Sequence, residues 1–441
     1  MKEKIFEFID NSAALAVELQ TELCKRPAIS PESGGEGELD KCEFLESWLK
    51  AQGINQLERY DAPDSRAKGG VRPSLVATIP GASPEAAASP EATASPEAAA
   101  SPESAASGSR LWIMSHLDVV PPGESSLWKS DPWTLVVAEG GERADGTPLG
   151  KRVIGRGVED NQQGLTSSVI AALALVKQGL KPSRTVKLLF AADEENGSGY
   201  GIGWIMKNHP ELFCNDDMVI IPDSGDSDGS SIEIAEKNLL WVKFTTSGLQ
   251  AHGSRPDQGA NAHLAGADLA LRLHYGLSQK FSAKDPLFEP DYSTFQPTKK
   301  EANVPNINTI PGEDVFCYDM RILPRYPASE VLQEIDRIKA EVEAKHSVTI
   351  NYTLAQQNES KATSPDAPLV KLLSKNVEEV YGVKSKPIGI GGGTVAAFLR
   401  NAGIDSVVWC RIDSTAHQPN EYALLDNMLG DAKVMALMMI S

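Results

Sequence analysis

Three acidic residues follow apolar runs that have the length of buried β-strands. Glu194 and Glu195 follow the run Val186–Phe190, and Asp223 follows Met218–Ile221 and Pro222. Parallel strands of an open α/β sheet end at one edge, and such folds place their sites there. Of two adjacent acids, one can bind a metal ion while the other transfers a proton. We therefore expect a metal site at this edge, with further ligands from elsewhere in the chain.

A histidine and an aspartate two residues apart lie on another apolar run. The run Leu111–Val120 carries His116 and Asp118, whose side chains share one face of a strand. An aspartate in this position can accept a hydrogen bond from the ring and fix its metal-facing tautomer. A structural histidine explains the pattern equally well.

Two further polar residues lie in loops. Asp160 ends a glycine-containing turn before an expected helix at about 165–178, and His417 lies in the loop 414–421. An aspartate at such a turn can direct both oxygens into a cleft and bridge two cations. Taken alone, a helix N-cap is the simpler interpretation of Asp160.

Together these residues form the ligand set of a site for two zinc ions. Two histidines and three carboxylates, one of them shared, give each ion three protein ligands and leave room for a water molecule. Asp118 would support the set, and Glu194 would accept a proton from the water. The five expected metal ligands are His116, Asp160, Glu195, Asp223 and His417.

The elements that must position these residues form a doubly wound α/β domain interrupted by an insertion. Residues 1–27 predict an amphipathic helix, and the strand Ser74–Ile79 is expected to pair close to Leu111–Met114. Between these strands, residues 82–109 contain a Ser-Pro-Glu repeat rich in alanine, which predicts a disordered excursion. The catalytic domain is expected to comprise residues 1–238 and 356–441.

Residues 239–355 have the character of an inserted α+β domain. Strands and helices follow one another there in the order β-α-β-β-α-β, which is the split-βαβ arrangement. The two middle strands are expected at 303–309 and 315–323. The glycine run 389–393 lies outside the insertion, and its spacing is not the dinucleotide fingerprint GxGxxG.

Composition excludes several classes of partner. The net charge of −18 disfavours nucleic acid as a partner, because phosphate binding needs a basic face. No apolar run is long enough to cross a membrane, and residues 1–27 lack the uninterrupted apolar segment of a signal peptide. The five cysteines are scattered without a CxxC pair, which favours neither a disulfide framework nor a thiolate zinc site. We expect a cytoplasmic protein.

The order of the motifs resembles one known family. SHLDVVPPG, GRGVEDNQQG, DEENGS, PDSG, AHGS, GGGT and TAHQPNE occur in the order found in the dinuclear zinc peptidases and deacylases. That family includes glutamate carboxypeptidase, aminoacylase, bacterial dipeptidases, acetylornithine deacetylase and succinyl-diaminopimelate desuccinylase. The resemblance covers the chain from about residue 30 to its end, apart from the repeat.

The resemblance implies a role for each site residue. Asp160 would bridge two Zn²⁺ ions, for which Co²⁺ or Mn²⁺ could substitute, and a cis peptide would follow it. His116 and Asp223 would hold one ion, and Glu195 and His417 the other, with Glu194 as general base. The family also implies a homodimer through the inserted domain, in which His252 stabilises the oxyanion in the partner subunit's site. The residues that would hold substrate are Asn308, Arg321, Gly393 and Thr394.

Details of the sequence favour a peptidase within this family. Asp223, where the deacylases carry glutamate, resembles the peptidase members, and Lys237-Asn238 stands where desuccinylases carry arginine. Val395 stands where many members have an acid after the glycine-threonine pair, so the family's substrate pocket does not carry over in full at this position. The leading hypothesis is an exopeptidase or dipeptidase acting beside a free carboxylate. The alternatives are an N-acyl-amino-acid deacylase and a non-catalytic homologue that binds amino-acid derivatives.

Overall fold

The computed structural model describes residues 1–82, 109–143 and 146–441, so the Ser-Pro-Glu repeat lies almost entirely outside the described residues. The chain divides into two compact units. Unit 1 consists of Met1–Ile234, Thr363–Pro387 and Phe398–Ser441. Unit 2 consists of Ala235–Ala362 and Ile388–Ala397, so the whole glycine run 389–393 belongs to the unit formed by the insertion.

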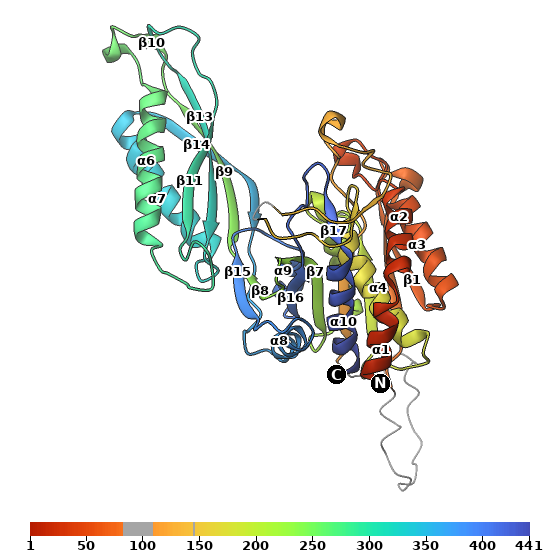
Figure 1. The fold of residues 1–441 in the computed structure, drawn as a ribbon. Helices are drawn as coiled ribbons and strands as arrows, with labels where there is room; N and C mark the ends of the chain where they lie inside the picture. Colours follow the sequence, from red (N-terminus) through yellow and green to blue (C-terminus); the bar gives the residue numbers. More distant parts are fainter. Residues whose placement is uncertain (83–108, 144–145) are drawn as a thin grey trace, which may run out of the picture. The chain divides into compact units, whose positions relative to one another are not determined.

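The main sheet has eight strands and is mixed, as the doubly wound interpretation predicts (Figure 1). The four strands β6, β3, β7 and β16 pair in parallel, while the pairs β1–β2, β2–β6 and β16–β8 are antiparallel. In sheet order the strands are β1 (Leu57–Pro63), β2 (Val71–Ile79), β6 (Val186–Ala191), β3 (Leu111–His116), β7 (Met218–Asp226), β16 (Asp405–Arg411), β8 (Ser231–Glu236) and β15 (Lys386–Ile390).

β2 lies close to β3 in the sheet, as expected, but the two strands do not pair directly. Strand β6 lies between them, with Leu75 opposite Phe190 on one side and Leu111 opposite Val186 on the other. The helix α4 (Gln162–Val176) lies between β3 and β6 in the chain and packs against β3, β6 and β7. Because a crossover helix can return the chain to either side of a strand, the sequence does not reveal this neighbour.

Helices of unit 1 cover the sheet. α4 is buried along almost its whole length and packs against α10, which also contacts α1 and α8 (Figure 1). The single helix expected over residues 1–27 is two helices, because the chain breaks at Asn11 and Ser12, where the Ser12 hydroxyl donates to the Phe8 carbonyl at 2.7 Å. The other α-helices that lie wholly in unit 1 are α1 (Lys2–Asp10), α2 (Ala13–Cys24), α3 (Leu39–Gln52), α5 (Ile202–Asn208), α8 (Pro368–Tyr381) and α10 (Leu425–Ile440). The helix α9 (Ala396–Asn401) begins in unit 2 and ends in unit 1.

Unit 2 has the predicted split-βαβ order around a four-stranded antiparallel sheet, β11-β13-β9-β14. Two long helices lie side by side over this sheet and enclose a core that includes Leu240, Leu269 and Ile335 (Figure 1). In chain order the elements are β9 (Asn238–Ser247), β10 (Ala251–His252), α6 (Ala262–Lys280), β11 (Thr294–Lys300), β12 (Thr309–Ile310), β13 (Glu313–Ile322), α7 (Ala328–His346) and β14 (Thr349–Asn358).

The expected strand at 303–309 was misplaced. The strand that pairs with β13 is β11, whereas residues 303–308 form a loop before the short β12. Only Phe295 is buried in β11, and the pairing is interrupted between Pro297 and Lys299. An edge strand with one buried residue and a proline lacks the alternation that identifies strands in a sequence.

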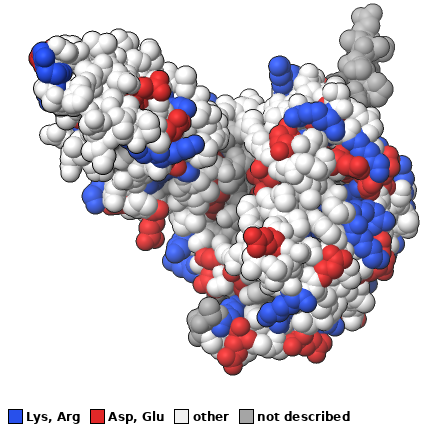
Figure 2. Space-filling view, turned by 90° about the horizontal axis from the view of Figure 1, so that it is seen from above, with Lys and Arg blue, Asp and Glu red and all other residues white. Residues whose placement is uncertain are grey.

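Within the described residues, no helix has both the length and the apolar character needed to cross a bilayer. On the face of the molecule in Figure 2, lysine and arginine side chains are interspersed with aspartate and glutamate. That face therefore lacks a continuous basic field of the kind that nucleic acid would require.

Candidate metal centre

The structure brings the five expected ligands and Glu194 together in unit 1 at the edge where the parallel strands end. His116 ends β3, Asp223 lies in β7, and Glu195 follows β6. Asp160 lies in the turn before α4, and His417 lies in the loop before β17 (Tyr422–Leu424). These residues come from five separate segments spread over 302 positions of the chain, from 116 to 417.

Asp160 lies between the two histidines. Its Oδ1 is 2.9 Å from Nε2 of His116, and its Oδ2 is 3.0 Å from Nε2 of His417. One carboxylate therefore presents a separate oxygen to each imidazole, which is the arrangement that a bridging ligand requires.

Each histidine has a second carboxylate of its own. Nε2 of His116 is 3.4 Å from Oδ1 of Asp223, and Nε2 of His417 is 3.1 Å from Oε2 of Glu195. The cluster thus has two halves that share Asp160. Each half offers one imidazole nitrogen and carboxylate oxygens, a donor set that suits divalent zinc, cobalt or manganese.

The charges of the cluster also fit cations. Potential ligand atoms of His116, Glu194 and Asp223 lie within 4.8 Å of one another, and so do those of His116, Asp160 and Glu195. Burial, and then the charge of Asp223, raise the pKa of Glu194 well above its usual value. Carboxylates gathered in a poorly solvated site repel one another unless positive charge compensates them. The residues present therefore fit a pair of divalent ions.

Hydrogen bonds within the cluster perturb both histidines. Those to Asp160 and Glu195 raise the pKa of His417 to about 10. Burial, the largest single influence, opposes protonation of His116, but the charge of Asp223 and the hydrogen bonds to Asp118, Asp160 and Asp223 together outweigh it and raise the pKa of His116. For Asp160, burial is outweighed by hydrogen bonds from both histidines, which lower its pKa.

Asp118 acts on the cluster in two ways. Nδ1 of His116 lies 3.0 Å from the backbone carbonyl of Asp118 and 3.5 Å from its carboxylate. A carbonyl only accepts, so Nδ1 carries a proton, and Nε2 is the nitrogen that faces the carboxylates and would bind a metal once its own proton is displaced. The Asp118 carboxylate accepts the backbone N–H groups of Glu194 and Glu195, each at 3.0 Å. It therefore positions the two glutamates as well as the histidine.

The turn at Asp160 differs from a helix cap. The N-cap residue of α4 is Asn161, and the peptide between Asp160 and Asn161 is cis, as the family resemblance implies. Nδ2 of Asn161 donates to the Pro222 carbonyl at 2.7 Å and also to Oδ1 of Asp223. Asn161 thus joins the Asp160 turn to the strand that carries Asp223.

The expected substrate residues form two groups within unit 2. His252 is exposed on β10, with Nδ1 2.8 Å from the Ser254 hydroxyl, and the N–H of Gly253 donates to the carbonyl of Asn308 at 2.7 Å. This pairing of β10 with β12 places His252 beside Asn308.

The second group surrounds Arg321. Its Nε donates to Oδ1 of Asp319 at 2.7 Å, and its Nη1 donates to the carbonyl of Gly391 at 2.8 Å. The Thr394 hydroxyl donates to Oε1 of Glu236 at 2.6 Å. Arg321 therefore contacts the glycine run that also contains Gly393.

The four remaining histidines have partners outside the candidate metal centre. His263 lies 3.0 Å from Asp314, His346 lies 2.9 Å from Asp268, and His274 lies 2.9 Å from the carbonyl of Phe295. His209 lies 3.5 Å from Glu211 and packs against Tyr60. Each has a structural contact, and none belongs to the groups of potential metal ligands among the described residues.

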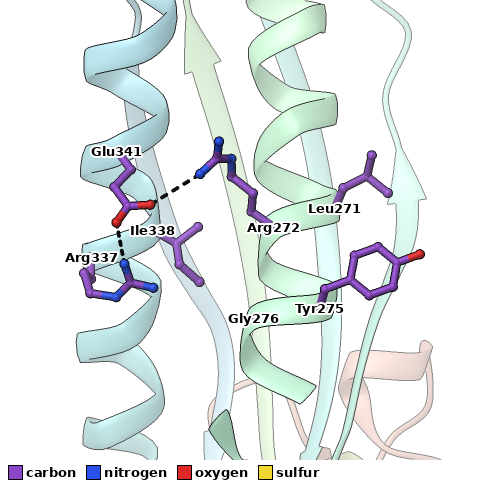
Figure 3. A pocket seen from close by; sticks show the side chains of 7 residues that line it. All are labelled: Leu271, Arg272, Tyr275, Gly276, Arg337, Ile338 and Glu341. Atoms are coloured by element: carbon purple, nitrogen blue, oxygen red, sulfur yellow. Dashed lines mark hydrogen bonds and ion pairs between the residues drawn. The ribbon is translucent and has the colours of Figure 1, made fainter. Parts of the chain in front are cut away.

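A cavity of about 320 Å³ in unit 2 lacks the residues for hydrolysis. It lies between α6 and α7, and its charged side chains are Arg272, Arg337 and Glu341, of which both arginines pair with the glutamate (Figure 3). Leu271, Tyr275, Gly276 and Ile338 complete its lining. A cavity without a histidine or an unpaired acid is a poor candidate for the reactive centre.

Sequence reasoning missed the buried charges behind the cluster. Arg72 is fully buried and binds Glu38, and Lys41 donates from the interior to the carbonyl of Leu117 at 2.9 Å. These residues belong to none of the motifs and are far from the ligands in the chain, so a single sequence offers no signal for them.

Comparison with known proteins agrees with this geometry. A protein of Methanococcus maripaludis named an uncharacterized metallohydrolase is 34% identical over 438 residues, covering 95% of this chain and 97% of its own. The succinyl-diaminopimelate desuccinylase of Cereibacter sphaeroides is 29% identical over 311 residues, covering 69% of this chain and 76% of its own. The structure of the dipeptidase Dug1p of Saccharomyces cerevisiae shares the fold, with a TM-score of 0.68 at 17% identity over 100% of this chain and 98% of its own.

Residues 112–441, which include every expected site residue, match the peptidase family M20/M25/M40. The chain is a metal-dependent hydrolytic enzyme and belongs to this family.

Proposed function

We propose that the chain hydrolyses an amide bond beside a free carboxylate in small peptides, with two zinc ions held by the cluster in unit 1. The observation that carries this proposal is the position of Asp160, whose two oxygens lie 2.9 Å and 3.0 Å from the Nε2 atoms of His116 and His417. A shared carboxylate between two histidines has no comparable use in a site for one ion.

The ligands divide between the two ions. His116 and Asp223 would hold one ion, Glu195 and His417 the other, and Asp160 both. Bound there, the ions would lower the pKa of a water molecule and polarise the substrate carbonyl. The Asp118 carboxylate accepts the backbone N–H groups of Glu194 and Glu195 and so fixes the position of both residues.

Glu194 would serve as the general base. It accepts a proton from the attacking water and passes it to the leaving nitrogen, so that the amine departs as a neutral group. Its burial next to Asp223 supports this role, because both features raise the affinity of the carboxylate for a proton.

Substrate binding would use residues of unit 2. Arg321 keeps two of its five N–H donors after its bonds to Asp319 and Gly391, and these suit a substrate carboxylate. Gly393 and Thr394 would line the same pocket, while Asn308 and His252, at the other end of β13, would act in the site of the partner subunit, where His252 would stabilise the oxyanion.

A second candidate function is deacylation of N-acyl amino acids. It is supported by the 29% identity to a protein named succinyl-diaminopimelate desuccinylase. One observation is against it. Lys237, at the position where desuccinylases carry arginine, donates to the carbonyls of Pro290 and Tyr292, at 2.8 Å and 2.7 Å, and so holds the backbone of unit 2.

The experiment that separates the two functions is a substrate panel combined with metal analysis. The purified protein would be assayed on dipeptides and on N-acetyl and N-succinyl amino acids, with zinc, cobalt and manganese measured in the same preparation. Cleavage of dipeptides with about two ions per chain is the expected result. Turnover of acyl substrates alone would reject the peptidase, and a single ion per chain would reject the shared centre.

We further propose a cytoplasmic homodimer formed through unit 2. Leu264, Leu271 and Tyr275 lie on α6 and are 57%, 59% and 67% exposed, which is unusual for large apolar side chains on one helix. All five cysteines are free, as a reducing compartment favours. Sedimentation of Leu271→Glu beside the unchanged protein tests the dimer, because a charge on this face should shift the protein to the monomer.

A further inference from the structure

Two buried glutamates behind the cluster have no place in the proposed chemistry. Glu159 is 4% exposed and Glu421 is fully buried. Glu159 precedes Asp160 directly, and Glu421 follows His417 by four residues. Buried carboxylates are costly unless their oxygens receive hydrogen bonds. The partners of these two therefore indicate what the residues are for.

Glu421 binds the backbone of the Asp160 turn. Its Oε1 accepts the N–H of Glu159 at 2.9 Å and that of Asp160 at 3.1 Å. Its Oε2 accepts the N–H of Gly157 at 2.9 Å and the guanidinium of Arg156 at 2.6 Å. A side chain from the His417 loop thus fixes the backbone that carries the shared ligand.

Glu159 binds the loop of His417 in return. Its Oε1 accepts the N–H of Asp413 at 2.9 Å, and its Oε2 accepts the N–H groups of Thr415 and, at 2.8 Å, Ala416. Ser414 and His417 have φ angles of 58° and 63°, in the left-handed region that non-glycine residues seldom adopt. Such a loop keeps its shape only where its surroundings hold it, and Glu159 supplies three of those bonds.

We propose that Glu159 and Glu421 are reciprocal positioning residues for the metal centre. Each extends from one ligand loop and binds the backbone of the other, so that Asp160 and His417 keep the spacing needed to share an ion. The inference rests on the proposed two-metal site. Neither glutamate is a ligand, because their oxygens are occupied by backbone N–H groups and by Arg156.

Loss of the Glu159 contacts and loss of the Glu421 contacts should have different effects on the binding of the two ions. Glu159 holds only the His417 loop, so its loss should weaken the ion bound by His417 and Glu195. Glu421 holds the turn of the shared ligand Asp160, so its loss should weaken both ions. A general loss of stability would not distinguish the ions.

The test is a stepwise Co²⁺ titration followed by the absorption spectrum and by competition with a chelator. We expect Glu159→Gln to bind the first ion as the unchanged protein does and the second about 10–100-fold more weakly. Glu159→Asp keeps the charge but shortens the side chain, and it should show the same selective loss. Glu421→Gln should weaken both ions.

The matched control is Glu233→Gln. Glu233 is also buried in unit 1 and pairs with Arg400 at 3.0 Å, outside the cluster. The Glu233→Gln protein should bind both ions with unchanged affinity. Circular dichroism of each metal-free variant shows whether that variant has folded. The positioning roles would be overturned if the Glu159 variants lost affinity equally for both ions or lost none. They would also be overturned if Glu233→Gln showed the losses expected of the Glu159 and Glu421 variants. If the unchanged protein fails to bind a second ion, the proposed function itself is rejected.

Discussion

The guanidinium of Arg72 lies 3.1 Å from Oδ1 of Asp193 in the interior of unit 1. Arg72 also binds both oxygens of Glu38, and Glu38 accepts the N–H of Asp193 at 3.2 Å. Asp193 has a φ of 64° and directly precedes Glu194, so its left-handed backbone sets the direction in which the chain reaches Glu194. The position of Glu194 therefore depends on a buried arginine distant in sequence.

Replacing Arg72 with methionine should destabilise the protein severely. The change leaves Glu38 and Asp193 buried without their cation, and breaking a buried ion pair from one side costs about 3–5 kcal/mol. Urea unfolding followed by circular dichroism would measure this as a lower midpoint. The turnover number should fall as well, because the turn before Glu194 loses its support.

Arg59→Met provides the comparison. Arg59 pairs with Asp61 at 3.0 Å near the surface, where an ion pair contributes about 0.2–1 kcal/mol. Its unfolding midpoint and turnover number should stay close to those of the unchanged protein. Equal destabilisation of the two variants would contradict a special role for Arg72.

Replacing Glu194 with glutamine tests whether it is a base or a ligand. We expect the turnover number to fall about 10²–10⁴-fold, since the amide cannot accept the proton, while two ions remain bound. Elemental analysis of the dialysed variant measures the ions. Loss of one ion would instead make Glu194 a ligand, which its proximity to His116 and Asp223 permits. Glu139→Gln, on the exposed surface, should change neither quantity.

The convergence of the expected ligands was predictable because these residues obey a local rule. The runs before His116, Glu195 and Asp223 are apolar enough to be central strands, and parallel strands must end at one edge. The identity of the residue types then suggested metal binding. His417 and Asp160 lie in loops, and they were identified through their motifs rather than through any periodicity.

The supporting contacts were not predictable for a physical reason. Arg72 and Glu38 lie 34 positions apart, and Glu159 and Glu421 act on loops more than 250 positions away. A charged residue in a sequence is most simply interpreted as solvated, and only the fold shows that these are buried. Strand β11 could not be predicted either, because its single buried residue gives no alternation of apolar and polar residues.

Metal affinity should rise with pH. In the metal-free protein, His417 has a pKa raised to about 10 and the pKa of His116 is also raised, so both carry protons near neutrality. A cation must displace these protons, so affinity should increase about tenfold per pH unit for each proton displaced below those pKa values. Chelator competition at about pH 6 and pH 8 measures the slope. A flat profile would show that the histidines are not ligands.

Arg321→Ala should weaken binding of substrates that end in a free carboxylate. The loss of a charge-assisted bond of about 1.5–3 kcal/mol predicts a KM about 10–100-fold higher. For the same dipeptide with an amidated C-terminus, the variant and the unchanged protein should differ little, because the charge that Arg321 recognises is absent. Arg325→Ala, which removes an arginine that stacks on Tyr326, is the control and should bind both substrates normally. An equal loss on both substrates would mean that Arg321 supports the glycine run through Gly391 and does not bind the carboxylate.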